Sequence, residues 1–212
     1  MILKPSFLEP KEIADKADEF RKLYVTPPNQ IPLDIEHIIE NVLKIRIDPR
    51  KNLSRISRKS DLAIDAFLTS DRSTIVVDYD QYMNDQGRLK FTFAHELGHW
   101  FLHKNEYKLV KYDSYEDFIK IQKSLDVKYR NWFEYQANEF AAVLLVPSNV
   151  LRNLSNKYLP DLKKFLKLNG ESQLWLMKNE IAEDLAQSFD VSSEVIKNRM
   201  SNEKILESLL EL

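Results

Sequence analysis

The sequence predicts an α+β fold in which helices precede and follow a small antiparallel sheet. Apolar residues recur at helical spacing before residue 43, short β-rich runs fill residues 44–80, and helical patterning continues from Gly87 almost to the end. The chain has 212 residues and is 43% hydrophobic, which is enough for a buried core. We expect one main domain over residues 1–150 and a helical subdomain over residues 151–212.

The first third of the chain is expected to supply two scaffold helices. Ile13, Ala17 and Phe20 recur at helical spacing between Glu9 and Tyr24. A second helix is predicted from Leu33 to Leu43, after a run of prolines that breaks the first.

Three short runs are expected to form the sheet. They are Ile45–Ile47, Ala63–Thr69 and Thr74–Tyr79. The polar turn Ser70–Ser73 separates the last two, so these strands should form a hairpin. Beyond Gly87, helices are expected with breaks near Asp113, Pro147, Pro160 and Gly170.

Composition excludes several kinds of site. The chain has no cysteine, so any metal must be held by His, Asp or Glu side chains. A net charge of −2 gives no general attraction to nucleic acid or to an anionic membrane. No apolar run has the ~20 residues that a spanning helix needs, and the start lacks a signal-peptide pattern. We therefore expect a cytoplasmic protein without a membrane segment.

The strongest motif is H-E-x-x-H at residues 95–99. His95 and His99 lie one helical turn apart, so both imidazoles project from one face and can bind one ion. Glu96 lies between them and is the candidate general base. The alternative is a surface helix with solvated histidines, but apolar residues on the opposite face indicate a helix packed against the core.

A catalytic zinc site needs a third protein ligand and an open position for water. Glu134 borders the apolar stripe of a later amphipathic helix and could face the two histidines. Spacing alone does not choose it over Glu139, Asp117 or Glu116. Asn138, one turn after Glu134, could support a metal ligand through a hydrogen bond.

Three other residues near the motifs have weaker assignments. His103 lies eight residues after His95, so on a continuous helix it is ~12 Å along the axis and cannot share the ion. A cavity-lining role and an ordinary helix-end role are equally consistent with its position. Gly98 is expected to allow close packing beside the metal, because glycine otherwise costs about 1 kcal/mol inside a helix. His37 is expected to be structural.

Two segments resemble the signature of the ImmA/IrrE family of metallopeptidases: F-T-F-A-H-E-L-G-H-W-F-L-H from Phe91, and E-Y-Q-A-N-E-F-A-A-V-L-L-V-P from Glu134. The resemblance extends more loosely over most of residues 10–200. It implies a zincin-like metallopeptidase domain in which Glu134 is the third ligand of one Zn²⁺ ion, with Mn²⁺ as an alternative. It also implies a protein substrate, a helix-turn-helix transcriptional repressor.

The expected reaction is hydrolysis of a peptide bond. Water in the open metal position has its pKa lowered toward ~7, and Glu96 takes its proton and passes it to the leaving amine. An extended substrate could pair with Ala63–Thr69 as an added strand. Tyr79, Tyr82, Tyr135 and His103 are alternatives for the residue that stabilises the oxyanion, and the sequence does not choose among them.

The C-terminal segment from Glu180 to Ile196 has a helix-turn-helix-like pattern, with Ser192 as the cap of its second helix. Residues 171–212 contain four basic and nine acidic side chains, a net charge of −5. Phosphate contacts need the opposite sign, so we expect packing or protein contacts rather than DNA binding.

Two functions of different classes remain. The first is a site-specific regulatory protease, and the second is a non-enzymatic regulator that uses the metal-bound fold to bind a protein or DNA. A binding module has no chemical need for a base beside the metal, so the intact Glu96 favours the protease. The oligomeric state is not determined by the sequence.

Overall fold

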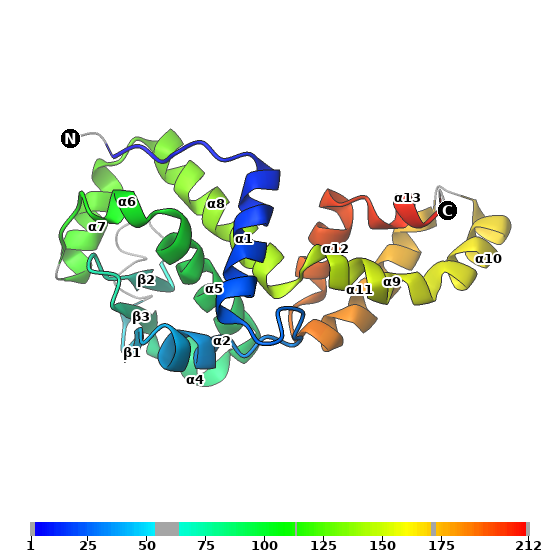
Figure 1. Ribbon diagram of the computed structural model, residues 1–212, viewed down its shortest axis with the longest axis horizontal. Helices are drawn as coiled ribbons and strands as arrows, with labels where there is room; N and C mark the ends of the chain where they lie inside the picture. The colour runs from blue at the N-terminus through cyan, green and yellow to red at the C-terminus, as the bar shows by residue number, and fades with distance from the viewer. Residues whose placement is uncertain (1–2, 54–63, 113, 171–172, 211–212) are drawn as a thin grey trace. The chain divides into compact units, whose positions relative to one another are not determined.

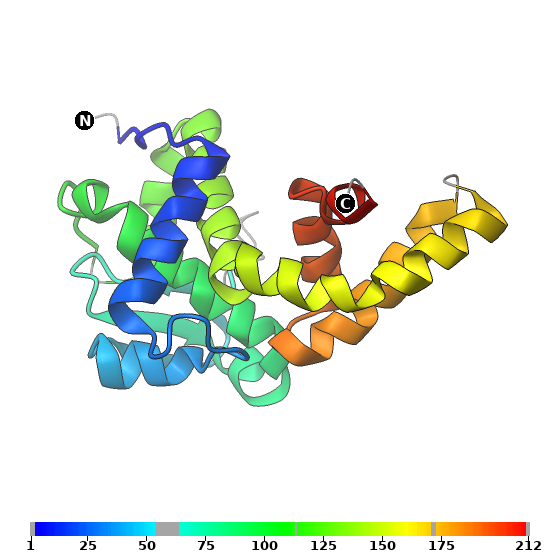
Figure 2. The same ribbon diagram turned by 45° about the vertical axis from the view of Figure 1, so that its right-hand side comes forward.

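The computed structural model describes residues 3–53, 64–112, 114–170 and 173–210 of the chain (Figures 1 and 2). Helices precede and follow one small sheet, which confirms the predicted α+β class. The chain forms two compact units. Unit 1 comprises Met1–Pro28 and Asp34–Leu144, and unit 2 comprises Asn29–Leu33 and Leu145–Leu212.

The sheet of unit 1 has the strand order β1-β3-β2. Its strands are β1 (Arg46–Arg50), β2 (Ala66–Leu68) and β3 (Thr74–Asp78). The β2–β3 pair is antiparallel, which confirms the predicted hairpin. Ala63, the expected start of β2, lies outside the described residues.

The expectation of a wholly antiparallel sheet is wrong, because β1 pairs with β3 in parallel. The strand β3 lies between β1 and β2. Because β2 runs opposite to both of its neighbours in sequence, β1 and β3 point the same way. Burial is consistent with this central position: all five residues of β3 are buried, as expected for a strand covered on both faces.

Three helices of unit 1 pack around one aromatic cluster. They are α1 (Pro10–Tyr24), α5 (Gln86–Leu102) and α8 (Val127–Leu145). Phe20 of α1 meets Phe101 of α5 and Phe140 of α8 edge to face, with ring centroids 5.4 and 5.8 Å apart. The same helices lie side by side in Figures 1 and 2. Burial of these rings fixes α5 and α8 as neighbours.

Shorter elements complete unit 1. They are α2 (Ile35–His37), the π-helix η1 (Ile38–Val42), α4 (Tyr79–Asn84), α6 (Lys104–Tyr107) and α7 (Tyr115–Ser124). The predicted helix over residues 33–43 is therefore part α and part π. The helix α4 was not predicted: Asp78 caps it by accepting hydrogen bonds from the backbone of Asp80 and Gln81.

In the part of unit 2 that follows Leu145, the regular structure of the described residues is helical. Its helices are α9 (Ser148–Ser155), the 3₁₀ turn η2 (Asn156–Tyr158), α10 (Leu159–Asn169), α11 (Leu174–Phe189), α12 (Ser193–Asn202) and α13 (Ile205–Leu210). The Ser192 side chain accepts from the Val195 backbone, which confirms the predicted cap of α12. Among the described residues, no helix is long and apolar enough to cross a membrane.

Candidate metal centre

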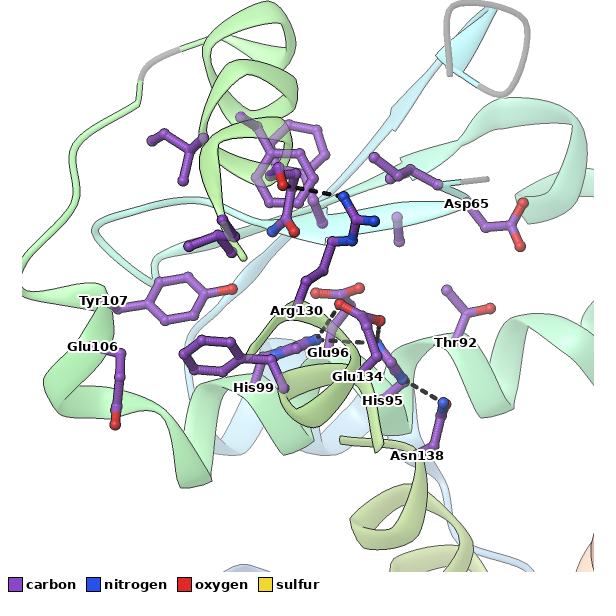
Figure 3. Close-up of a pocket in the computed structure, with 18 of the residues that line it drawn as sticks. Asp65, Thr92, His95, Glu96, His99, Glu106, Tyr107, Arg130, Glu134 and Asn138 are labelled. Carbon is purple, nitrogen blue, oxygen red and sulfur yellow. Dashed lines mark hydrogen bonds and ion pairs between the residues drawn. The ribbon is translucent and has the colours of Figure 1, made fainter. Parts of the chain in front are cut away.

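His95, His99 and Glu134 converge on one point, as Figure 3 shows. Their ligand atoms all lie within 4.8 Å of one another, and they form the one such group of three His, Asp or Glu side chains found in the part of the chain that is described. The alternatives Glu139, Asp117 and Glu116 do not belong to this group. The structure therefore brings together the three residues that the two motifs single out.

Two helices supply these side chains. His95 and His99 lie on α5, and Glu134 lies on α8. Gly98 lies where the helices meet: a Cβ there would be 3.0 Å from both the Cα and the carbonyl oxygen of Ala137. The absence of a side chain at Gly98 lets α8 come close enough for Glu134 to reach the histidines.

The spacing of the ligand atoms fits a tetrahedral ion. Bonds of ~2.0–2.1 Å in tetrahedral geometry place ligand atoms roughly 3.3–3.4 Å apart. The Nε2 atoms of His95 and His99 are 3.1 Å apart. Glu134 places Oε2 3.2 Å from His95 Nε2 and Oε1 3.7 Å from His99 Nε2. Two imidazoles and one carboxylate suit zinc, and they leave a fourth position for water or substrate.

The electrostatics of the three side chains also favour a cation. Burial opposes charge on Glu134, but its hydrogen bond to His95 and the nearby imidazoles outweigh burial and lower its pKa to about 2. Burial likewise opposes charge on His95, but the Glu134 hydrogen bond and the Glu96 charge raise its pKa to about 9. Burial lowers the pKa of His99 well below its usual value. The site thus holds an ionised carboxylate beside a protonated imidazole, so a metal ion would take the place of the His95 proton next to Glu134.

Glu96 lies beside this cluster and is 4% exposed. Burial raises the pKa of its carboxyl to about 7, the His95 charge opposes that rise, and the Glu134 charge adds to it. The backbone of Leu68 on β2 also hydrogen-bonds this carboxylate. A carboxyl whose pKa lies near neutrality can both accept and return a proton at physiological pH.

Polar side chains contact the Nδ1 atoms of both histidines, on the side of each ring away from the cluster. Asn138 Oδ1 lies 2.8 Å from His95 Nδ1, which agrees with the supporting role expected for Asn138. His103 Nδ1 lies 3.0 Å from His99 Nδ1, and His103 Nε2 lies 3.0 Å from Gln136 Oε1. His103 is outside the ligand group, as expected, and it does not line the cavity. It is the C-cap of α5, so the helix-end position is correct, and its buried ring also bonds His99 and Gln136. Burial lowers its pKa to about 4.

The cluster opens into a cavity of about 460 Å³. Asp65 and Thr92 lie on one side of it, and Tyr107 lies on the other (Figure 3). Tyr107 packs in one hydrophobic cluster with four other lining residues: Val110, Tyr112, Phe118 and Ile121. Phe133 also lines the cavity. A concave, mainly apolar site with a few convergent polar groups is the usual form of a substrate pocket.

The four oxyanion candidates taken from the sequence do not line this cavity. Tyr107 and Arg130 do, and Figure 3 shows the Tyr107 ring pointing toward the centre of the site and Arg130 extending above Glu134. Neither was singled out from the sequence. Tyr107 follows the end of α5 and Arg130 precedes Glu134 by one turn, so proximity to the two motifs was the available signal.

Comparison with known proteins identifies the family of the chain. The family model described as the IrrE N-terminal-like domain, a family of peptidases, matches residues 55–201. No curated protein matches the chain at a significant level. Among solved structures, a Mycobacterium tuberculosis transcriptional regulator shares 14% identity and a TM-score of 0.48, over 90% of this chain and 51% of that one. The chain thus spans about half the length of that regulator. On the family match, the chain belongs to the IrrE N-terminal-like peptidase family and carries a metallopeptidase-like domain.

Proposed function

We propose that the protein is a zinc-dependent endopeptidase that cleaves a specific regulatory protein, a helix-turn-helix transcriptional repressor. The convergence of His95, His99 and Glu134 next to the buried Glu96 is the observation that carries this proposal. Family membership supports the peptidase chemistry. The choice of a repressor as substrate rests on the resemblance to the ImmA/IrrE family, and a cytoplasmic location is part of the same proposal.

In the proposed reaction, His95, His99 and Glu134 hold the metal. When bound, a divalent cation of this kind polarises the substrate carbonyl and makes water more acidic. Glu96 accepts a proton from the water that attacks the carbonyl carbon. As the C–N bond breaks, Glu96 returns that proton to the nitrogen of the leaving amine. Burial raises the pKa of Glu96, which favours its uptake of a proton from the attacking water.

The strand β2 is positioned to bind the substrate backbone. In the sheet as described it is an edge strand, and its pairing with β3 runs through Asp65, Phe67 and Thr69. In an antiparallel pair the intervening residues point their N–H and C=O groups outward. For Leu68 both outward groups are already bound, by Glu96 and by the Tyr112 hydroxyl at 2.5 Å. Within the described residues, the outward groups of Ala66 remain to pair with an extended peptide, and such a peptide would run along the cavity that Glu96 also lines.

The test compares the parent protein with Glu96→Gln. Each is assayed for bound metal by elemental analysis and incubated with candidate helix-turn-helix repressors. We expect one zinc per chain in both proteins, with defined repressor fragments from the parent and cleavage slowed by ~10²–10⁴-fold in the variant. Glu139→Gln is the matched control, because it makes the same chemical change on α8 outside the ligand group and should retain zinc and cleavage.

Two results would count against the endopeptidase. Zinc in both proteins with cleavage by neither would favour the alternative, a non-enzymatic regulator that binds a protein through the metal-bound fold. A parent protein without bound metal would remove the chemical basis of the proposal.

A further inference from the structure

A chain of buried hydrogen bonds runs from the metal cluster to the N-terminal segment. His99 Nδ1 meets His103 Nδ1 at 3.0 Å, His103 Nε2 meets Gln136 Oε1 at 3.0 Å, and Gln136 Nε2 donates to the Ser6 carbonyl oxygen at 2.7 Å. His103 is 1% exposed and Gln136 is fully buried. His103 and Gln136, which take no part in the proposed reaction, therefore form buried hydrogen bonds that end at the metal ligand His99.

The Ser6 carbonyl oxygen determines which atom donates and which accepts in every hydrogen bond of this series. A carbonyl oxygen can only accept, so the amide nitrogen of Gln136 faces Ser6 and the amide oxygen faces His103. That oxygen must receive a proton, so the neutral His103 ring carries its hydrogen on Nε2. Its Nδ1 is then an acceptor and receives the Nδ1–H of His99. This leaves the lone pair of His99 on Nε2, the atom that faces His95 and Glu134.

We propose that His103 and Gln136 are positioning residues that hold His99 in its Nε2-ligating tautomer, with the Ser6 carbonyl of the N-terminal segment as the fixed end of the chain. This inference rests on the proposed function in taking the cluster to be a metal site. It adds two supporting residues and gives the N-terminal segment a role at the metal centre.

The other tautomers are incompatible with these contacts. If His99 carried its hydrogen on Nε2, two lone pairs would face each other across the 3.0 Å between the Nδ1 atoms. If His103 carried its hydrogen on Nδ1, its Nε2 lone pair would face the Gln136 oxygen. Both positions are buried, so water does not readily replace the lost hydrogen bond.

Contacts other than these hydrogen bonds also hold the N-terminal segment in place. Phe7, next to Ser6, stacks on Trp132 of α8 with ring centroids 4.8 Å apart and planes 4° apart. The amine of Lys4 lies 5.9 Å from the centre of the Tyr129 ring, also on α8. The segment therefore contacts the helix that carries Gln136 and Glu134, which positions the Ser6 carbonyl relative to both.

The experiment measures zinc affinity by competition with a zinc-binding dye, with the zinc ion alone as the probe. His103→Leu and Gln136→Leu each remove one link, and we expect zinc to bind ~10–100-fold more weakly to each. His103→Gln, which restores an acceptor oxygen, should recover most of that loss. Phe133→Leu is the packing control: its ring contacts His103 at a centroid distance of 4.8 Å but makes none of the hydrogen bonds. Its zinc affinity should change less than those of the two variants that remove a link.

A second readout needs neither metal nor variants. Two-bond ¹H–¹⁵N NMR spectra of the metal-free parent report which ring nitrogen carries the hydrogen. We expect His99 protonated at Nδ1 and His103 at Nε2. The inference is overturned if His103 is protonated at Nδ1, or if folded His103→Leu and Gln136→Leu bind zinc as the parent does. A parent that binds no zinc would instead refute the metal site itself, while the NMR result would still test the hydrogen-bond chain.

Discussion

At the scale of single residues, the environment decides what each side chain of the motif can do. Glu96 and Glu134 are both glutamates within one cluster, but burial raises the pKa of Glu96 to about 7, whereas the contacts with His95 and His99 lower that of Glu134 to about 2. Two carboxyl groups whose pKa values are moved apart are suited to different roles. Glu134 stays ionised as a ligand, and Glu96 exchanges a proton.

Gly98 is the residue whose replacement tests the helix contact most directly. Gly98→Ala gains about 1 kcal/mol of helix propensity, but it forces a methyl group against the Ala137 backbone, which costs about 1–3 kcal/mol. We expect a net loss of up to about 2 kcal/mol in the free energy of unfolding, measured by denaturant titration, and weaker zinc binding because α8 is pushed away.

Gly87 provides the matched control for Gly98. It lies in the first turn of α5, and a methyl group on its Cα would have no neighbouring atom within 4 Å. Gly87→Ala should leave stability unchanged or raise it by up to about 1 kcal/mol. Equal effects of the two substitutions would show that α5 and α8 do not approach closely at Gly98.

At the scale of elements, the short edge strand β2 connects the sheet to the chemistry. Its backbone N–H and C=O groups on one side pair with β3. On the other side, the backbone of Leu68 forms hydrogen bonds with the base Glu96 and with the Tyr112 hydroxyl. The helices α5 and α8 supply the ligands, and α7 helps to enclose the cavity through Phe118 and Ile121. The site is therefore assembled from rigid elements, which keeps its geometry precise.

Ala66→Pro tests whether β2 binds the substrate backbone. The Ala66 N–H points away from β3, so proline there removes an outward donor of β2 without breaking a hydrogen bond to β3. Loss of one hydrogen bond to substrate corresponds to about 0.5–1.5 kcal/mol, so we expect KM for the repressor to rise up to about tenfold, measured by initial rates of cleavage.

The stability of the Ala66 variant completes that test. Phe67→Pro removes an N–H that pairs with β3 and should destabilise the fold, whereas Ala66→Pro should melt close to the parent. An unchanged KM for a folded Ala66→Pro protein would mean that the substrate binds elsewhere.

At the scale of the whole molecule, the two compact units differ in what they contribute. Every residue of the metal cluster and its cavity belongs to unit 1. Unit 2 includes residues 171–212, whose net charge of −5 gives no support for DNA binding. We continue to propose that this segment makes protein contacts.

Metal should stabilise the protein because the ligands come from two helices. At a free zinc concentration about 1,000 times Kd, binding adds about 4 kcal/mol to the folded state. For a chain of this size that corresponds to a rise in Tm of roughly 8–16 °C, measured by circular dichroism with zinc and after treatment with a chelator. Glu134→Ala lacks one ligand and should show a much smaller rise. An unchanged Tm in the parent would contradict a metal site joining α5 and α8.

The sequence by itself determined the helical pairing of His95 and His99, because a spacing of four residues places both on one helix face. It also determined the α+β class and the β2–β3 hairpin, since periodicity and turn residues are local signals. The expected domain division at residue 150 stays a prediction. The selection of Glu134 came from family resemblance, since spacing left four acidic candidates.

Only the tertiary structure decided the contacts between segments far apart in the chain. The central position of β3 makes the sheet mixed, Gly98 meets Ala137, and the Ser6 carbonyl reaches the metal cluster through Gln136 and His103. Tyr107 and Arg130 join the cavity for the same reason. These contacts depend on how helices and strands pack, and packing is set by the whole core rather than by the local pattern of residues.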